Sequence, residues 1–488
     1  MSDEPLKILM VASEIAPFAK TGGLADVVGS LPQALAKLGH EVRLIMPWYR
    51  SVPQQVGKLA LSRRKLAVPL GGRVYQCGYR AGVSGEVATY FLDAPQFYDR
   101  PELYGEAGED YPDNAERFAL LSRAALELTR LLDFAPDVIH CHDWQTGLVP
   151  VYLKHKLWRD PFFADTRTLF SIHNLGYQGI FPLEQYRQLD LEQELLGIDG
   201  LEYHGRLSLL KAGIRFADLV NTVSPSYCEE IKTPQQGMGM DGLLRARGEQ
   251  LHGILNGLDG QLWNPQHDTA LAHCYSAKDI SGKALCKQAL QRELGLKEQA
   301  QTPIVAMVTR LDSQKGIELV LESWDHIMAQ KLQLVILGSG NPDYERCLTE
   351  AAAFYPGQAK VLPEFDDALS RRIYAGSDLF LMPSRYEPCG LGQLIALRYG
   401  AVPLAHATGG LADTIYDPED ALEQAPDLSN GFLFKRYRHD DMLAGLKRVL
   451  NCYAEPEKWR KLQQRGMAQD MSWQKAAEQY VELYRKGA

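Results

Sequence analysis

Short apolar segments with the character of β-strands alternate with helical patterns along almost the whole chain. The segments are continuously apolar, as in parallel sheets that helices cover on both faces. The pattern predicts an α/β fold of two doubly wound Rossmann-like domains that face each other across a deep crevice, with ligands outside the carboxyl ends of the strands. The predicted strands are Lys7–Ala12, Val42–Met46, Ala88–Leu92, Val138–Cys141, Thr168–Ile172, Leu219–Val223, Ile304–Val308, Gln333–Leu337, Lys360–Leu362, Leu379–Met382 and Val402–Ala405.

The chain is too long, at 488 residues, for one ordinary hydrophobic core, so two domains are expected. Asn-Gly and Asp-Gly turn signals follow one another at Leu255–Gly260 and indicate the boundary. We expect an N-terminal domain over residues 1–255 and a C-terminal domain over residues 256–471. A final amphipathic helix within residues 472–488 is expected to pack back across the boundary.

Charge and composition narrow the classes of partner. The net charge of −9 argues against non-specific binding of nucleic acid or of an anionic membrane. No apolar run approaches the ~20 residues that a membrane span needs, and the polar N-terminus has no secretory signal. The eight cysteines show neither a Cys-x-x-Cys pair nor metal-ligand spacing. We therefore expect a cytoplasmic protein with reduced thiols.

The hexamer Thr-Gly-Gly-Leu-Ala-Asp occurs twice, at Thr21–Asp26 and at Thr408–Asp413. Each copy places two glycines where a strand gives way to a helical pattern, so that free backbone N–H groups can approach an anion closely. Lys20 precedes the first copy, whereas Ala407 precedes the second. Two similar halves, one of which has an additional cation, indicate a phosphorylated ligand held between two nucleotide-binding domains.

Arg310 and Lys315 leave the predicted strand Ile304–Val308 in one loop. They form either a solvated basic loop or the cations that neutralise a diphosphate leaving group, since an Arg fork and a Lys point charge suit that role. The spacing by itself does not decide between the two.

A second candidate segment, Ser384–Gly392, follows the strand Leu379–Met382 and opens a helix. The N–H groups of Gly390 and Leu391 at that helix start would form another phosphate cradle. Glu387 lies just before it, where it would meet a sugar hydroxyl or a developing positive charge. A Glu before a Pro can also be a plain helix-approach residue, but its position beside the cradle favours a functional role.

Histidines and an aspartate end two strands of the first half. His173 follows Thr168–Ile172, although a lone histidine is more often structural and its role depends on its neighbours. His140 and His142 are expected to point to opposite faces of their strand, which would exclude a shared metal ion and leave Asp143 as a polar group at the strand end. The chain has no strand-end Asp-x-Asp motif, so we expect Arg, Lys and helix dipoles, rather than a metal, to meet phosphate charge.

A dinucleotide-dependent oxidoreductase is the rival for two such domains. Its Gly-x-Gly-x-x-Gly fingerprint is missing after the first strand, where Lys20-Thr21-Gly22-Gly23 stands instead. Gly338-Ser339-Gly340 lacks the third glycine, and a P-loop is absent. These absences disfavour the oxidoreductase.

Nine motifs together make the chain resemble the bacterial glycogen synthases and plant starch synthases, which are retaining glucosyltransferases of the GT-B architecture. The resemblance covers essentially the whole chain, and the motifs fall in the family's order and spacing. They are Lys20–Asp26, His142-Asp143-Trp144, His173-Asn174-Leu175, Lys211-Ala212-Gly213, Val223-Ser224-Pro225, Asn256-Gly257, Arg310–Gly316, Glu387–Leu391 and Thr408–Asp413.

The resemblance implies transfer of glucose from a nucleotide-glucose, in bacteria usually ADP-glucose, to the non-reducing 4-hydroxyl of glycogen or another α-1,4-glucan. It implies retention of the anomeric configuration and neither a metal nor another cofactor. The N-terminal domain would take the acceptor side and the C-terminal domain the nucleotide-sugar side. The choice between ADP-glucose and UDP-glucose and the oligomeric state stay open.

In the first half, the resemblance implies that Lys20 and Gly23 contact the donor phosphates. His173 would hydrogen-bond the glucosyl ring, with Asp143 near the reacting sugar or the acceptor. The other substrate contacts that it implies in this half are Gly22, Asn174 and Asn256.

In the second half, Arg310 and Lys315 would neutralise the departing diphosphate, joined by the N–H groups of Gly390 and Leu391. Glu387 would hydrogen-bond the glucosyl ring. The other implied contacts are Cys389, Phe365, which would stack on the adenine where a Tyr is better known, and Gly392, which stands where a Thr is expected.

Two mechanisms and two other functions stay open at this point. Either the departing phosphate takes the acceptor's proton, or Glu387 forms a covalent glucosyl-enzyme. A nucleotide-sugar transferase with a small acceptor, such as a sucrose-forming enzyme, is one alternative function. A catalytically silent glucan-binding protein is the other, and it predicts loss of the phosphate-binding cations that this chain retains.

Overall fold

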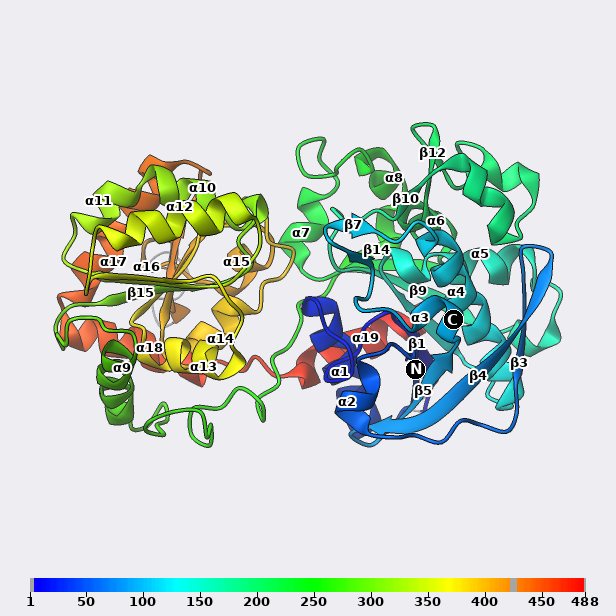
Figure 1. Ribbon diagram of the computed structural model, residues 1–488, viewed down its shortest axis with the longest axis horizontal. Coiled ribbons are helices and arrows are strands. Elements are labelled where there is room, and N and C mark those ends of the chain that lie inside the picture. Colours follow the sequence, from blue (N-terminus) through cyan, green and yellow to red (C-terminus); the bar gives the residue numbers. More distant parts are fainter. Residues whose placement is uncertain (1–3, 422–427, 487–488) are drawn as a thin grey trace. The chain divides into compact units, whose positions relative to one another are not determined.

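The computed structural model describes residues 4–421 and 428–486 and divides the chain into two compact units. The first unit comprises Met1–Gly257 together with Trp473–Ala488, and the second comprises Leu258–Ser472. Each unit has its own sheet, and we describe the two separately (Figure 1).

The first unit is built on a nine-stranded sheet. Seven neighbouring strands run parallel. Nearly every residue of β8 and β9 is buried, as expected for parallel strands that helices cover on both faces. In spatial order the strands are β14 (Leu251–Gly253), β13 (Leu219–Thr222), β9 (Arg167–Ile172), β8 (Val138–His142), β1 (Lys7–Val11), β2 (Glu41–Pro47), β5 (Val87–Asp93), β4 (Arg73–Ser84) and β3 (Leu66–Leu70).

One edge of this sheet is an antiparallel hairpin that the sequence pattern did not indicate. β3 pairs antiparallel with β4, and β4 pairs antiparallel with β5. β4 contains Gly78 and Gly82 and several polar residues, so it lacks the continuous apolar run by which the parallel strands were predicted. Two small sheets complete the unit: β10 (Ile180–Phe181), β12 (Arg206–Ser208) and β11 (Glu202–Tyr203), and β6 (Gly105–Glu106) with β7 (Glu109–Asp110).

Helices of the first unit include the C-terminal one. Its apolar face, with buried Ala477, Tyr480 and Tyr484, joins the core of this unit and packs against α1. The helices are α1 (Gly23–Lys37), α2 (Val52–Val56), α3 (Pro95–Tyr98), α4 (Asn114–Leu131), α5 (Leu148–His155), α6 (Leu209–Phe216), α7 (Pro225–Glu230), α8 (Asp241–Ala246) and α19 (Trp473–Arg485).

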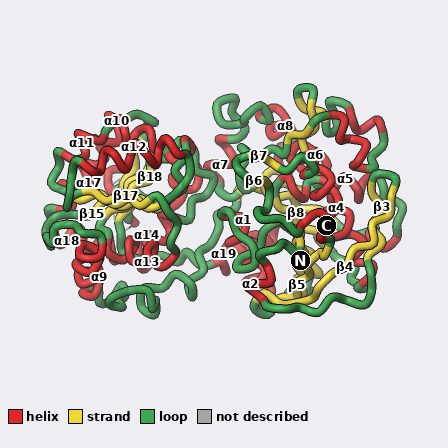
Figure 2. Tube along the Cα trace, viewed as in Figure 1, coloured by secondary structure: helices red, strands yellow, loops and turns green. Residues whose placement is uncertain are grey.

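The second unit has a six-stranded, all-parallel sheet between two layers of helices (Figures 1 and 2). Successive residues of β16 alternate between two hydrophobic clusters: Leu334 and Ile336 belong to one, Val335 and Leu337 to the other. Because side chains alternate across a strand, the two clusters are the two covered faces of one sheet. The strands in order are β17 (Ala359–Leu362), β16 (Gln333–Leu337), β15 (Ile304–Val308), β18 (Leu379–Met382), β19 (Val402–His406) and β20 (Phe432–Phe434).

The helices of the second unit lie on both faces of that sheet. They are α9 (Ser281–Glu293), α10 (Ile317–Glu322), α11 (Trp324–Met328), α12 (Pro342–Ala353), α13 (Asp367–Gly376), α14 (Gly392–Arg398), α15 (Gly409–Thr414), α16 (Pro418–Ala421), α17 (His439–Tyr453) and α18 (Pro456–Ala468). Within residues 4–421 and 428–486, no helix combines the length and the apolarity that crossing a membrane requires.

Candidate active site

In the first unit, the carboxyl ends of β8 and β9 bring Asp143 and His173 together. His142 pairs with Ser171 in the ladder, so the residues after these two strands meet at one edge of the sheet. Asp143 adopts φ 56°, in the left-handed region that non-glycine residues seldom occupy. Backbone strain of this kind persists only where the surroundings enforce it, and it is concentrated at functional sites.

The Asp143 carboxylate is buried and held by backbone donors. Its Oδ1 accepts a hydrogen bond of 2.7 Å from the His173 N–H, and the Asn174 N–H donates to it as well. Burial raises the pKa of Asp143 to about 7, because it outweighs these donors, and the charge of Glu14 adds to the increase. Near neutral pH this carboxyl is poised between its protonated and ionised forms.

The prediction that His140 and His142 point to opposite faces is wrong. Their ring centroids lie 4.0 Å apart, because residues i and i+2 of a strand share one face. The two nitrogens of His140 are engaged by the hydroxyls of Tyr484, at 2.9 Å, and Ser171, at 2.6 Å. In the described part of the chain, no three His, Cys, Asp or Glu side chains are grouped so as to hold a metal ion.

His173 extends this row of rings to the strand end. Its Nε2 lies 3.0 Å from Nδ1 of His142. Burial lowers the pKa of His173 to about 3, so the imidazole is neutral at working pH. His140 and His142, which are equally buried, also have pKa values well below the ordinary value.

The first hexamer forms the start of α1. Gly22 is its N-cap, Gly23 is its first residue, and a Cβ added to either would meet nothing within 4 Å. Packing therefore does not require glycine at these two positions, and their backbone borders open space. Lys20 lies beside them and pairs with Asp26 at 2.7 Å, its side chain 46% exposed.

Glu14, which was not among the predicted site residues, holds the loop of the first hexamer. Its carboxylate accepts hydrogen bonds from the backbone N–H of Thr21, from the Thr21 hydroxyl at 2.7 Å and from the Tyr104 hydroxyl. The side chain is 3% exposed, and it fixes the loop that carries Lys20. An acidic residue placed directly between the first strand and the glycine loop was the signal available in the sequence.

Two asparagines complete the polar residues predicted in the first unit. Asn174 follows His173 and accepts a hydrogen bond from the Gly176 N–H through its side chain. Asn256 lies at the end of the unit, and its buried Oδ1 has no hydrogen-bond partner within the described residues. A buried acceptor without a partner is costly, so its presence favours a role in ligand binding.

In the second unit, Lys315 and Glu387 form a buried ion pair. Nζ of Lys315 lies 2.7 Å from Oε2 of Glu387, and the two side chains are only 16% and 7% exposed. Ser384 also donates to Oε2, at 2.9 Å, whereas the other oxygen, Oε1, has no partner within the described residues. The two predicted residues, 72 positions apart in sequence, thus share one site.

Local structure sets the position of Lys315. It ends the 3-10 helix Ser313–Lys315, whose N-cap Asp312 accepts a hydrogen bond from the Lys315 N–H. Gly316 then has φ 71°, and a Cβ there would lie 1.9 Å from the Pro383 carbonyl oxygen. Only glycine allows the Lys315 loop to approach the segment that carries Glu387 so closely.

Arg310 lies in the same loop and is half exposed. It pairs with Asp312 at 3.2 Å and donates to Gln314 at 3.4 Å. Gln314 in turn donates to the Tyr386 carbonyl oxygen, so Arg310 is linked to the Glu387 segment through one side chain.

The start of α14 follows Glu387 directly. The N–H groups of Gly390 and Leu391 have no acceptor within the described residues, as a phosphate cradle requires. Gly390 has φ 77°, so glycine is favoured there on backbone grounds. A Cβ at Gly392 would lie 3.2 Å from Cε1 of Phe380, which explains why the Thr expected at this position has little room.

The second hexamer, Thr408–Asp413, does not offer the free backbone N–H groups that were predicted for both copies. A Cβ at Gly409 would lie 2.0 Å from the Glu387 carbonyl oxygen, and one at Gly410 would lie 2.0 Å from that of Cys389. The Gly410 N–H donates to the Glu387 carbonyl oxygen at 3.1 Å and is therefore not free for an anion. The second copy thus supports the segment that carries Glu387.

The structure places the last two predicted contacts differently. Phe365 lies between β17 and α13 and is 76% exposed, and no contact in the structure joins it to Lys315 or Glu387. Cys389 is buried beside the α14 start.

The fold and the site residues together define the class of the protein. Each of the two units has a doubly wound sheet with polar side chains at the ends of its strands. The prediction of a two-domain α/β fold is confirmed, and it is the fold of the GT-B glycosyltransferases. Residues 7–246 match the family model of the starch synthase catalytic domain, and residues 291–465 match that of glycosyl transferases group 1.

Relatives match the chain over its whole length. The glycogen synthase of Syntrophotalea carbinolica is 51% identical over 481 residues, which is 99% of each chain. Glycogen synthase 2 of Geobacter sulfurreducens is 46% identical over 483 residues, again 99% of each. This chain belongs to the glycogen synthase and starch synthase family of glycosyltransferases.

Solved structures agree with this assignment. The catalytic domain of starch synthase IV from Arabidopsis thaliana, bound to ADP and acarbose, has a TM-score of 0.92 and 35% identity and covers 99% of both chains. Sucrose-phosphate synthase from Thermosynechococcus elongatus has a TM-score of 0.61 at 21% identity, covering 99% of this chain and 98% of its own, and shares the fold alone.

Proposed function

We propose that this glycosyltransferase transfers glucose from ADP-glucose to the non-reducing 4-hydroxyl of an α-1,4-glucan, with retention of the anomeric configuration. Relatives named glycogen synthase, and a starch synthase structure bound to ADP and acarbose, support the donor and acceptor classes. The observation that carries the proposal is the Lys315–Glu387 pair beside two N–H groups without acceptors.

The residues of the second unit suit a diphosphate that gains negative charge as it leaves. Lys315 and Arg310 provide cations, and the N–H groups of Gly390 and Leu391 provide neutral donors on a rigid helix start. Donors that are already in place need no reorganisation during reaction, and one of them is commonly worth about 3 kcal/mol of transition-state stabilisation.

Glu387 has a different part in this proposal. Its Oε2 is occupied by Lys315 and Ser384, while Oε1 remains available to a sugar hydroxyl. A carboxylate whose charge is neutralised by a lysine at 2.7 Å is a weakened nucleophile. We therefore favour transfer without a covalent intermediate: the bond from the anomeric carbon to phosphate breaks, the acceptor oxygen bonds on the same face, and the departing phosphate oxygen takes the acceptor's proton.

In the first unit, His173 and Asp143 would hold the sugar. His173 is neutral, so its ring can serve as a hydrogen-bond donor without adding a cation near the anomeric centre. Asp143 is poised near pH 7, and its ionised form would stabilise positive charge on the sugar. Lys20 and the open backbone at Gly22 and Gly23 would contact donor phosphate from this unit.

The test measures nucleotide release from ADP-glucose and, separately, from UDP-glucose, each with and without glycogen. Incorporation of labelled glucose into polymer is followed in the same samples, with and without EDTA. We expect glycogen-dependent ADP release, equal to the glucose incorporated and insensitive to EDTA. Turnover with a small sugar acceptor but not with glycogen, or no turnover with either donor, would overturn the proposal.

A further inference from the structure

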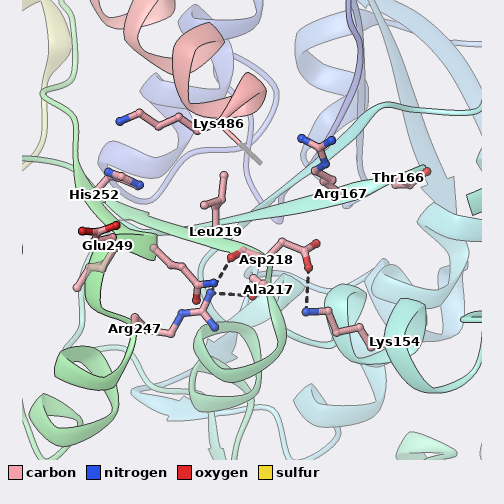
Figure 3. Close-up of a pocket in the computed structure, with 12 residues that line it drawn as sticks. Lys154, Thr166, Arg167, Ala217, Asp218, Leu219, Arg247, Glu249, His252 and Lys486 are labelled. Carbon is pink, nitrogen blue, oxygen red and sulfur yellow. Dashed lines mark hydrogen bonds and ion pairs between the residues drawn. The ribbon is translucent and has the colours of Figure 1, made fainter. Parts of the chain in front are cut away.

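A cavity lies in the first unit, at the opposite end of the strands from Asp143 and His173. It has a volume of about 870 Å³ and is bordered by the amino-terminal starts of β9, β13 and β14 and by the end of α19 (Figure 3). Arg167, which starts β9 at the cavity, precedes His173 by six residues, so the cavity lies roughly 20 Å along the strand from His173. Its size falls in the range of about 300–1,000 Å³ that is usual for small-molecule sites.

Positive charge predominates around this cavity. Lys154, Arg167, Arg247 and Lys486 border it, against the carboxylates of Asp218 and Glu249. Burial and the nearby Lys486 lower the pKa of His252, which is therefore neutral at neutral pH. The cavity consequently carries an excess of two positive charges.

Two of these four cations, Lys154 and Arg247, already interact with other groups of the protein. Lys154 pairs with Asp218 at 2.9 Å, and Arg247 donates to the backbone carbonyl oxygens of Ala217 and Asp218 at 2.8 Å each. Arg167 and Lys486 differ, because no hydrogen bond or ion pair of their side chains exists within the described residues. They supply an Arg fork and a Lys point charge that a ligand can engage.

The lining also indicates which chemistry fits. No Phe, Tyr or Trp side chain borders the cavity, and the His252 imidazole is the one ring in its lining, so the cavity offers little stacking surface for a sugar ring or a nucleobase. A phosphate monoester carries about −1.5 to −2 charge at pH 7, which matches the excess positive charge, and it offers several acceptor oxygens. The volume leaves room for a small organic body attached to the phosphate.

A row of buried side-chain contacts runs from the end of α19 beside the cavity to His173. Two residues before Lys486, the Tyr484 hydroxyl lies 2.9 Å from Nδ1 of His140. The rings of His140 and His142 are tilted by 34° with centroids 4.0 Å apart, and Nδ1 of His142 lies 3.0 Å from Nε2 of His173. A change in the last turn of α19 would therefore act on the row of rings that positions His173.

We propose that this cavity is a binding site for a small phosphate-bearing metabolite and that its occupancy regulates glucosyl transfer. The proposed regulation rests on the function proposed above, whereas the proposed binding of the metabolite does not depend on that function. The site is distinct from the one described above, since it lies at the amino-terminal starts of β9, β13 and β14, whereas Asp143 and His173 follow the carboxyl ends of β8 and β9.

Binding is tested by calorimetric titration of the full chain with glycerol 3-phosphate and with inorganic phosphate at constant ionic strength. The double variant Arg167→Gln/Lys486→Gln should weaken binding by about tenfold or more, since two charge-assisted contacts are lost. Lys58→Gln/Arg63→Gln removes the same charge elsewhere in the first unit and should leave binding unchanged, as should Lys315→Ala. The proposed site would be rejected if the protein bound neither ligand, or if Lys315→Ala alone abolished binding.

Regulation is tested by measuring glucosyl transfer with glycerol 3-phosphate present. We expect the rate or the KM for donor to change in the wild type and in Lys58→Gln/Arg63→Gln, but not in Arg167→Gln/Lys486→Gln. Equal effects in all three proteins would place the effect at the donor site and reject the proposed regulation. A chain without transferase activity would reject the proposed function and leave the binding result standing.

Discussion

In the first unit, Nδ1 of His142 lies 3.0 Å from Nε2 of His173. The other nitrogen of His142, Nε2, is buried and has no partner within the described residues. An unpaired buried N–H is rarer than an unpaired buried acceptor, so we infer that His142 carries its proton on Nδ1 and donates it to His173. His173 then carries its own proton on Nδ1, where it can donate to a sugar oxygen.

This tautomer predicts that His142 positions His173. His142→Leu should lower kcat by about tenfold, the equivalent of one hydrogen bond, with a smaller change in KM. His142→Asn, whose amide can occupy the position of Nδ1, should recover most of the loss. Steady-state kinetics of the two variants provide the test, and equal losses in both would point to packing alone.

The Lys315–Glu387 pair should be essential for turnover. Lys315→Ala and Glu387→Gln should each lower kcat by at least about a hundredfold, because a fixed charge near the reacting bond is lost. Lys331→Ala, which removes an exposed lysine of the same unit, is the matched control and should retain full activity. If either Lys315→Ala or Glu387→Gln retained the kcat of the wild type, the substituted residue would have no catalytic role.

Substitutions of Lys315 and Glu387 should affect the stability of the fold differently from the activity. Lys315→Ala leaves a carboxylate buried without its cation and should destabilise the protein by about 3 kcal/mol. The double variant Lys315→Met/Glu387→Gln removes both charges and should recover most of the unfolding temperature while remaining inactive. Thermal unfolding measured beside kinetics separates the two effects; a double variant as unstable as Lys315→Ala would contradict the argument.

Asp143 should make stability depend on pH. Its folded pKa of about 7 exceeds the ordinary value of 3.8, so the folded state holds a proton that the unfolded state has lost. Its contribution to stability is therefore present below about pH 4 and is lost as pH rises to about 7, by at most about 1.4 kcal/mol per pH unit. His173 has the opposite sign, because its pKa is lowered to about 3 and stability is lost as pH falls below 6.5.

The single variant isolates the Asp143 contribution. The gain in unfolding temperature of Asp143→Asn over the wild type should grow between pH 4 and pH 7 and then level off. Asp165→Asn, at an exposed aspartate of the same unit, should show no such trend. A difference that does not vary with pH would show that the carboxylate is not buried as described.

The two hexamers should respond oppositely to the same substitution. Gly23→Ala places a methyl group in open space, so stability should be unchanged or rise by up to about 1 kcal/mol, while the KM for the donor increases. Gly410→Ala places a Cβ 2.0 Å from the Cys389 carbonyl oxygen and should destabilise by about 1–3 kcal/mol. Thermal unfolding and donor KM would be measured for both; equal destabilisation by the two substitutions would refute the distinction.

Among the parallel strands of the described residues, all but the short edge strands β14 and β20 were predicted to within a residue or two. β15, β16 and β18 have the predicted bounds, because continuous apolar runs report burial on both faces. The hairpin of β3 and β4 was not predictable in this way, since an edge hairpin with polar residues and glycines leaves no such run. Strand alternation already places His140 and His142 on one face, whereas the position of His173 beside them depends on the pairing of β8 with β9.

The sequence alone determined the parallel α/β fold, the family and the residue types at the strand ends, because these follow from local apolar patterns and from motifs in a set order. Only the tertiary structure decided how those residues are used. It paired Lys315 with Glu387, turned the second hexamer into a support for that segment, and joined His140 to Tyr484. These relationships depend on contacts between segments distant in the chain, on which no local pattern carries information.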